Sequence, residues 1–235
     1  MTAAAAACCD DRGGLGTVPA VVRPPNPLRK RFHQQLEDID TKVVRLFALV
    51  TESVAAATDA LLGGDAEAAR QLAGRDTLVD RLEDDLERLA ERELFMQQPM
   101  AGDLRYLISV LRVVPELERS GDLATHIAQR ATTDLASRLT PTVRGQLDRM
   151  GTTCVRMWQA AADAWIERDA GAVEVIDAMD DEIDALAAQL TAELESGAVG
   201  LTESMQTTLL CRFYERLGDH AVHITERIRY LSPGT

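Results

Sequence analysis

The residues best suited to metal or acid–base chemistry recur in this chain as one pattern in two places. Each set has a Glu, an Asp and a His at positions i, i+4 and i+8: Glu118, Asp122, His126 and Glu215, Asp219, His223. On a helix, with about 100° per residue, three such side chains cover only about 80° of the surface. Each set is therefore predicted to form one stripe of two carboxylates and an imidazole, turned toward solvent or a shallow groove.

Two further carboxylate pairs occur upstream of these stripes. Asp76 and Asp80 are spaced i, i+4, as are Asp180 and Asp184. Such pairs are usually solvated faces, and like charges at this spacing destabilise a helix by a few tenths of a kcal/mol. If the helices that carry the pairs and the stripes are neighbours, the carboxylates face each other across a seam. Carboxylate oxygens and an imidazole suit Fe, Zn, Mn or Mg, so we expect divalent or ferric metal ions there.

Six long helical segments are expected to position these residues. Glycine, proline and serine separate them at 63–64, 99–102, 141, 196–197 and 200. Asp65 is a predicted N-cap, and Pro115 lies inside the third segment, where it should kink the backbone. The expected helices span residues 28–62, 65–98, 102–137, 141–168, 169–195 and 201–231.

The second three helices repeat the first three. Residues 116–130 and 213–227 share the skeleton E-R-x-G-D-x-A-x-H-I, which helix formation alone does not require. We therefore predict an all-α fold of two tandem antiparallel three-helix bundles, at 28–138 and 139–235. Residues 1–27, rich in glycine and proline, are predicted to be a disordered tail.

Composition and charge limit the partners and the cellular compartment that we expect for this protein. The net charge of −13 disfavours nucleic acid and favours metals or basic protein surfaces. The four cysteines form no CxxC pair, which fits a reducing cytoplasm. No run of 18 apolar residues is present, so we expect no insertion into a membrane.

Several motifs resemble those of the PhoU family. "LERSGDLATHI" and "YERLGDHAVHI" resemble its acidic signature, and "RFHQQLEDID" and "FMQQPMAGDLR" are similar to its N-terminal and helix-junction motifs. The resemblance implies negative regulation of phosphate uptake and of the phosphate-starvation response. It implies as partners the ATPase of the phosphate ABC transporter, a phosphate-sensing histidine kinase and a second copy in a homodimer.

The resemblance also implies metal clusters bound through the acidic motifs. It assigns as ligands Asp76, Asp80, Glu118, Asp122, Asp180, Asp184, Glu215 and Asp219. His126 and His223 stand where the family often has Asn, and would add nitrogen ligands or leave the site unchanged.

Other functions stay open at this stage. An enzyme is disfavoured because the chain has no nucleophile motif and no phosphate-binding loop, and a di-iron site would need Glu-x-x-His pairs. A metal-free helical adaptor, or a PhoU-type regulator of another transporter, would fit the same residues. A small ligand at the bundle junction near 138–141 has no specific support.

Overall fold

The computed structural model describes residues 27–231, with the exception of the side chains of Pro27, Leu28 and Asp76. Within this range every regular element is helical. The elements are α1 (Pro27–Gly63), α2 (Ala66–Gln97), α3 (Gly102–Gln129), the 3₁₀ helix η1 (Arg130–Thr133), α4 (Leu135–Arg138), α5 (Pro141–Glu167), α6 (Ala172–Glu195) and α7 (Leu201–Leu231). The predicted tail lies outside the described residues, apart from Pro27, which begins α1.

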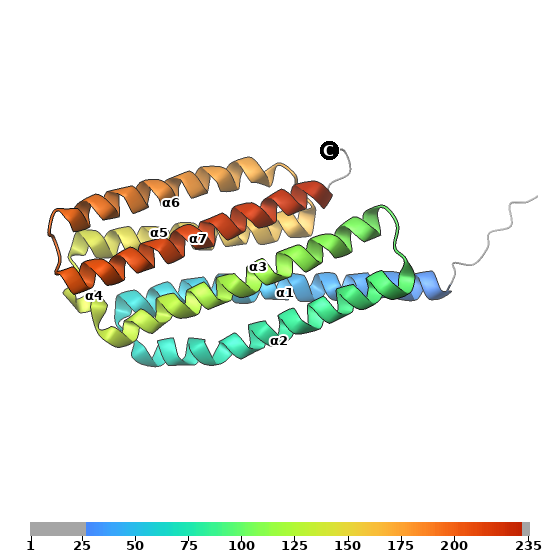
Figure 1. The fold of residues 1–235 in the computed structure, drawn as a ribbon, viewed down its shortest axis with the longest axis horizontal. Helices are drawn as coiled ribbons and strands as arrows, with labels where there is room; N and C mark the ends of the chain where they lie inside the picture. The colour runs from blue at the N-terminus through green and yellow to red at the C-terminus, as the bar shows by residue number, and fades with distance from the viewer. Residues whose placement is uncertain (1–26, 232–235) are drawn as a thin grey trace, which may run out of the picture.

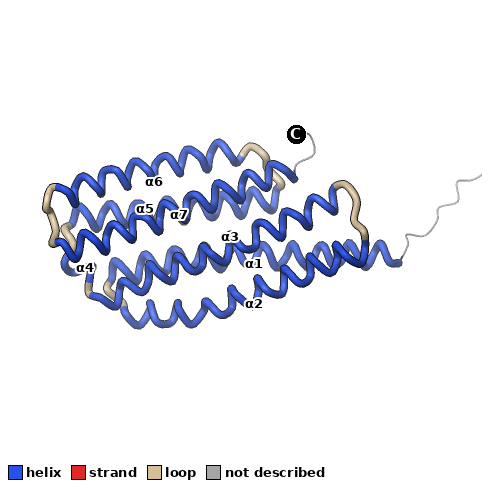
Figure 2. The backbone as a smooth tube through the Cα atoms, in the orientation of Figure 1, coloured by secondary structure: helices blue, strands red, loops and turns tan. Residues whose placement is uncertain are grey.

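The long helices form two antiparallel three-helix bundles that lie side by side (Figure 1). The first contains α1, α2 and α3, and the second contains α5, α6 and α7. They meet through two helix pairs, α1 with α5 and α3 with α7. The predicted all-α, two-bundle fold is confirmed, and the connections are short (Figure 2).

Local chemistry explains most helix ends. The Asp65 side chain accepts hydrogen bonds from the backbone N–H groups of Glu67 and Ala68, which confirms the predicted N-cap. Thr140 caps α5 in the same way, with Pro141 at the start of that helix. Gly64 and Gly197 have positive φ angles of 67° and 79°, which glycine adopts without a Cβ clash.

Two predicted boundaries were wrong. The third helix does not continue to Ser137, because α3 ends at Gln129 and Asp134 then turns into the left-handed region at φ 54°. The fifth helix begins at Ala172 rather than Asp169, because Asp169 accepts a hydrogen bond from the Gly171 N–H in a turn. The third helix does run unbroken through Pro115.

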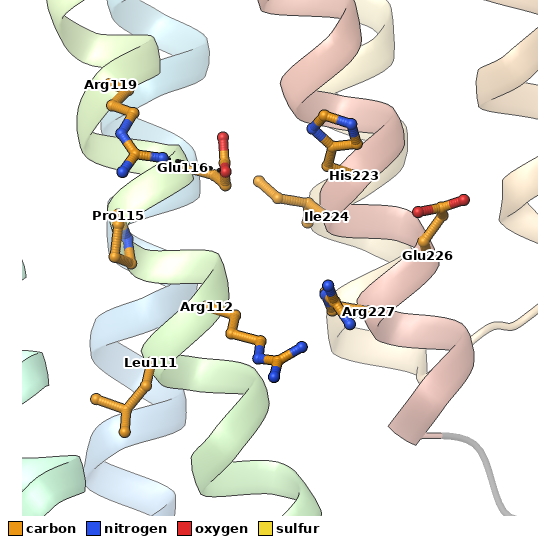
Figure 3. A pocket seen from close by; sticks show the side chains of 9 residues that line it. All are labelled: Leu111, Arg112, Pro115, Glu116, Arg119, His223, Ile224, Glu226 and Arg227. Atoms are coloured by element: carbon orange, nitrogen blue, oxygen red, sulfur yellow. Dashed lines mark hydrogen bonds and ion pairs between the residues drawn. The ribbon is translucent and has the colours of Figure 1, made fainter.

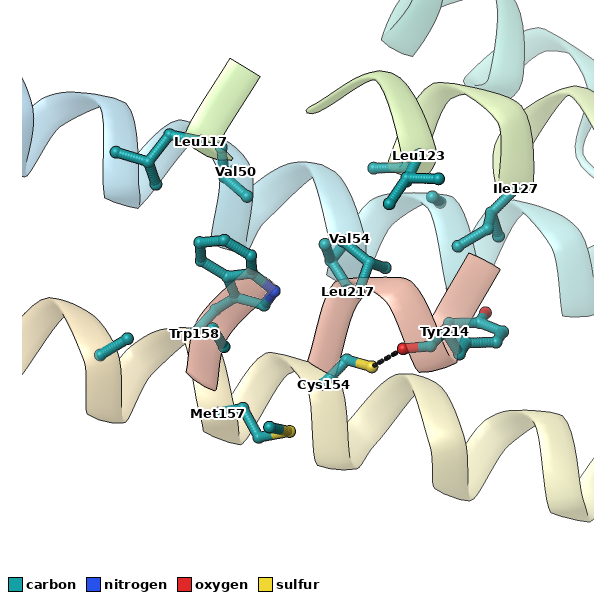
Figure 4. Packing of buried hydrophobic residues seen from close by; sticks show 14 of the residues in the cluster. Val50, Val54, Leu117, Leu123, Ile127, Cys154, Met157, Trp158, Tyr214 and Leu217 are labelled. Carbon is teal, nitrogen blue, oxygen red and sulfur yellow. Dashed lines mark hydrogen bonds between the residues drawn. The ribbon is translucent and has the colours of Figure 1, made fainter. Parts of the chain in front are cut away.

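The core is continuous between the bundles. Val50 and Val54 of α1, Cys154 and Trp158 of α5 and Tyr214 of α7 belong to one buried cluster (Figure 4). By length and composition alone, α1 is the single described helix that is apolar enough to cross a membrane. In this fold many of its apolar residues, among them Val43, Leu46 and Phe47, are fully buried in the shared core, and others, such as Val44 and Leu49, are partly buried.

A polar junction at one end ties the bundles together. Asp40 Oδ1 on α1 accepts hydrogen bonds from Tyr106 Oη (3.0 Å), Trp165 Nε1 (2.9 Å) and Arg168 Nη2 (2.7 Å). The Arg168 guanidinium also lies over the Tyr106 and Trp165 rings, 5.2 and 4.6 Å from their centres. One carboxylate oxygen thus joins α1, α3 and α5.

Candidate functional site

The seam between α2 and α3 gathers carboxylates. Burial, followed by the negative charges of Asp122, Glu83 and Asp80, raises the pKa of Glu118 to about 7. Asp80 and Glu83 lie on α2, whereas Glu118 and Asp122 lie on α3. We call these four residues the first acidic seam.

The seam between α6 and α7 gathers a second set. Burial raises the pKa of Asp180 to about 6, with Asp184 and Asp219 as the next contributions. Burial also raises the pKa of the Cys211 thiol to about 12, with Glu215 adding to the effect and Asp184 contributing less. We call Asp180, Asp184, Glu215 and Asp219 the second acidic seam.

A helical glycine lies in each seam, and the two have different neighbours. A Cβ on Gly218 would overlap Asp180 Oδ1, so the absence of a side chain there lets that carboxylate approach α7. A Cβ on Gly121 would lie 3.3 Å from Val79 Cγ1, an apolar neighbour. Gly121 therefore serves helix packing, and Gly218 also makes room for an acidic side chain.

The structure places the two predicted histidines toward the α3–α7 contact. His126 on α3 is exposed, and its ring stacks on Phe213 of α7 with the ring centres 5.7 Å apart. His223 on α7 is also exposed, and it lines a cleft with Glu116 of α3. The carboxylates thus lie in the seams, and the imidazoles point toward the neighbouring bundle.

Sequence reasoning missed Glu83, which belongs to the first acidic seam. Its pKa is raised by burial, and then by Glu87, Asp84 and Asp80. Its position three residues after Asp80 is a helical signal that it shares the same face. In the second repeat the corresponding residue is Ala187, so the first seam carries one carboxylate that the second lacks.

Sequence reasoning also gave no separate role to His220. This side chain is 6% exposed, its Nδ1 lies 2.9 Å from Ser120 Oγ, and its Nε2 lies 3.6 Å from Glu116 Oε2. Burial lowers the pKa of His220, against the opposing effect of Glu116. The available signal was a mismatch between repeats, since the residue that corresponds to His220 is Leu123.

The donor chemistry of both seams suits hard cations, which bind carboxylate oxygens. Within residues 27–231, and leaving aside the Asp76 side chain, no three His, Cys, Asp or Glu groups already converge to hold a metal ion. A metal at either seam would therefore require side-chain rotation. The carboxylates that could then contribute are Asp80, Glu83, Glu118 and Asp122 in the first seam, and Asp180, Asp184, Glu215 and Asp219 in the second.

Comparison with known proteins identifies relatives over most of the chain. The model of the PhoU domain matches residues 43–131 and 147–228. A Mycobacterium tuberculosis protein named phosphate-specific transport system accessory protein PhoU homolog 2 is 30% identical over 210 residues, covering 88% of this chain and 99% of that protein. An Aquifex aeolicus protein named PhoU homolog is 32% identical over 210 residues, covering 87% and 94%.

Solved structures share the fold as well. The crystal structure of PhoU from Pseudomonas aeruginosa has a TM-score of 0.79 and 29% identity, covering 87% of this chain and 100% of that one. The phosphate transport system regulatory protein PhoU from Streptococcus pneumoniae has a TM-score of 0.76 and 26% identity, covering 87% and 98%. With a PhoU domain in each bundle and this agreement in sequence and fold, the chain belongs to the PhoU family.

Proposed function

We propose that this protein is a cytoplasmic regulator of phosphate uptake and of phosphate-starvation signalling, which restrains both when phosphate is plentiful. The observation that carries the proposal is the pair of acidic seams, displayed on a scaffold whose relatives are named as accessory proteins of phosphate-specific transport. Those names describe accessory proteins and not enzymes, which supports a regulatory role.

The proposed partners are the ATPase of a phosphate ABC transporter and a phosphate-sensing histidine kinase. Each seam is an acidic surface, and acidic surfaces attract basic protein surfaces and accelerate their encounter. Because the chain carries two related seams, it has two surfaces with which to bridge two partners. A homodimer is proposed as the assembly that presents them.

Metal binding at the seams is the second part of the proposal. The raised pKa values of Glu118 and Asp180 reflect carboxylates that are partly buried and repel their neighbours. A bound Fe, Zn, Mn or Mg ion would neutralise this repulsion and fix the surface that a partner meets. His126 and His223 lie toward the α3–α7 contact, which makes them weaker candidates as ligands than the carboxylates.

A metal-free adaptor is the competing function, and one observation favours it. No three candidate donors converge among the described side chains. In that case the carboxylates would contact lysine and arginine residues of a partner directly.

The regulatory role is tested by deleting the gene in the source organism. We expect phosphate uptake and a phosphate-starvation reporter to rise in phosphate-rich medium, and the intact gene to restore both. A complemented strain carrying Asp122→Asn with Asp219→Asn should stay derepressed. Unchanged uptake and reporter levels after deletion of this gene and any second copy would contradict the proposed role.

The metal is tested on the purified full-length protein. Elemental analysis after loading with each metal and desalting should show bound metal in the wild type and less in the Asp122→Asn, Asp219→Asn double variant. Asp163→Asn is the matched control, because Asp163 is exposed on α5 outside both seams. If the wild type retains no metal but still binds the transporter ATPase, the adaptor function replaces the metal-bound one.

A further inference from the structure

A cleft with a volume of 470 Å³ lies between α3 and α7, outside the acidic seams. Arg112 and Arg119 of α3 and His223 and Arg227 of α7 line it (Figure 3). Glu116 and Glu226 also line it, so three arginines outnumber two carboxylates there, which reverses the sign of the charge in a chain whose net charge is −13. Such a reversal points to a ligand of opposite sign to the ions expected at the seams.

Two of these guanidinium groups face each other without carboxylate partners. Arg112 and Arg227 extend from opposite helices into the space between them (Figure 3). Among the described residues neither makes an ion pair, whereas Arg119 pairs with Glu116 at 3.2 Å. The Glu226 carboxylate points away from Arg112 in this view. Two facing cations repel each other unless an anion lies between them.

A buried hydroxyl adds a donor beside the same arginines. A second cavity of 320 Å³ shares the Arg112 and Arg227 side chains as its wall and is also lined by Ser109 and Tyr230. Ser109 is 1% exposed, and its Oγ has no hydrogen-bond partner within the described part of the chain. A buried hydroxyl without a partner is unfavourable unless a ligand or water satisfies it.

The internal duplication did not produce this cleft twice. In the alignment of 116–130 with 213–227, Phe213 stands where the cleft has Glu116. The same alignment continued upstream places Leu209 at the position of Arg112. At the opposite end of the α3–α7 contact, which is equivalent to the cleft by duplication, the stacked rings of Phe213 and His126 occupy the corresponding space. Arg227 has an arginine counterpart in Arg130, so the facing pair, and not each arginine by itself, is specific to the cleft. Helix packing at the opposite end does without that pair, and a ligand explains it.

We propose that this cleft binds a phosphate-type anion, held between the Arg112 and Arg227 guanidinium groups. The planar guanidinium donates paired hydrogen bonds that match phosphate oxygens, and charge-assisted bonds of this kind are strong. Ser109 supplies a neutral donor at the back. Both cavities fall in or near the size range of small-molecule sites, which leaves room for a phosphorylated metabolite as well as free orthophosphate. The site goes beyond the proposed regulatory contacts and does not depend on metal at the seams.

The test is calorimetric titration of the full-length protein in chelator at low salt, with orthophosphate and with ATP as separate probes. Sodium chloride at equal ionic strength is the blank. We expect saturable binding that weakens by about tenfold or more in Arg112→Gln and in Arg227→Gln, since each loses a charge-assisted pair. Arg112→Lys should also weaken binding, because lysine keeps the charge but lacks the paired N–H donors of the planar guanidinium. Arg88→Gln, an exposed arginine on α2, is the matched control and should bind as the wild type does.

A second measurement uses the unaltered protein. Phenylglyoxal modifies accessible arginines, and mass spectrometry should show that the anion protects Arg112 and Arg227 but not Arg88. Tighter binding of orthophosphate would identify free phosphate as the ligand, and tighter binding of ATP would identify a nucleotide. The absence of saturable binding for both probes, or equal binding in Arg112→Gln, Arg227→Gln and Arg88→Gln, would overturn the site.

Discussion

The last helices of the two repeats, α3 and α7, retain one face and differ on the other. Toward the middle helices both present Glu and Asp at the same positions, as Glu118 and Asp122 in α3 and Glu215 and Asp219 in α7. Toward each other they differ. Buried His220 of α7 corresponds to Leu123 of α3, and the two repeats therefore meet through unlike residues.

This difference shows how a duplicated scaffold acquires two kinds of surface. The acidic seams lie within each bundle, so each repeat carries its own. The α3–α7 contact lies between bundles, so its two ends were free to become different. One end has the stacked pair of His126 and Phe213, and the other has Glu116, Ser120 and His220 in a polar cluster.

The largest expected effect on stability concerns Tyr214, a core residue of the last helix of the second repeat. Tyr214 of α7 is fully buried, and its hydroxyl lies 3.0 Å from Thr58 Oγ1. Tyr214→Ala should lower the free energy of unfolding by about 3–5 kcal/mol, because it leaves a large cavity. Tyr214→Phe should lower it by only about 1 kcal/mol, since Thr58 Oγ1 still donates to the Val54 carbonyl. Urea unfolding measures both; equal losses would show that the hydrogen bond, and not packing, dominates.

A smaller effect distinguishes His220 from its counterpart Leu123. The pKa of His220 is lowered by burial, so the unfolded chain takes up a proton near pH 6.5 that the folded protein resists. The wild type should therefore lose stability as pH falls through that range. His220→Leu should lose less between pH 7.5 and 5, as followed by thermal unfolding. His33→Gln, at an exposed position of α1, is the control. A parallel pH profile for His220→Leu and wild type would count against the assignment.

The two acidic seams should change the stability of the fold over different pH ranges. In chelator, the pKa of Glu118 at about 7 and of Asp180 at about 6 lie above their ordinary values of 4.5 and 3.8. Each group stabilises the fold at acidic pH, and this contribution is lost as pH rises to its folded pKa. The stability of Glu118→Gln relative to wild type should rise with pH up to about 7, and that of Asp180→Asn up to about 6. Solvent screening keeps both effects to roughly 1 kcal/mol or less. Thermal unfolding from pH 4 to 8 measures them, and coincident profiles would mean that the seams are equivalent.

The smallest effect separates the two exposed histidines. His126→Ala removes a ring that stacks on Phe213, which should lower stability by about 0.5–1 kcal/mol. His223→Ala removes a ring that has no aromatic partner among the described residues, so its effect should be smaller. Urea unfolding of both variants tests the ranking, which equal losses would refute.

Helix periodicity and punctuation predicted most of the fold. Glycine and proline marked the ends of α1, α2, α5 and α7 closely, because they act through local backbone geometry. The end of α3 was missed since Asp134 adopts a left-handed conformation that no glycine announces. A single long helix was therefore predicted where the chain forms α3, η1 and α4.

The candidate site was predictable only in part, and the reason is geometric. Spacing along one helix identified Glu118 and Asp122 as neighbours on one face. It did not reveal which way His126, about 80° round the helix from Glu118, would point, because that depends on the packing of α7. The pairing of Arg112 with Arg227 has the same origin, since those residues are distant in sequence and meet only through the contact between bundles.

The position of α1 has a consequence for dividing the molecule. This helix contributes to the first bundle and, at the same time, covers the apolar side of α5 around Trp158 and Trp165. A fragment containing only residues 139–235 would expose that side and should aggregate or recruit a substitute helix. Co-expression with residues 1–138 should restore a soluble complex, held by Asp40 together with Trp165 and Arg168. The repeats are duplicated units in sequence, but they are expected to unfold in one cooperative transition.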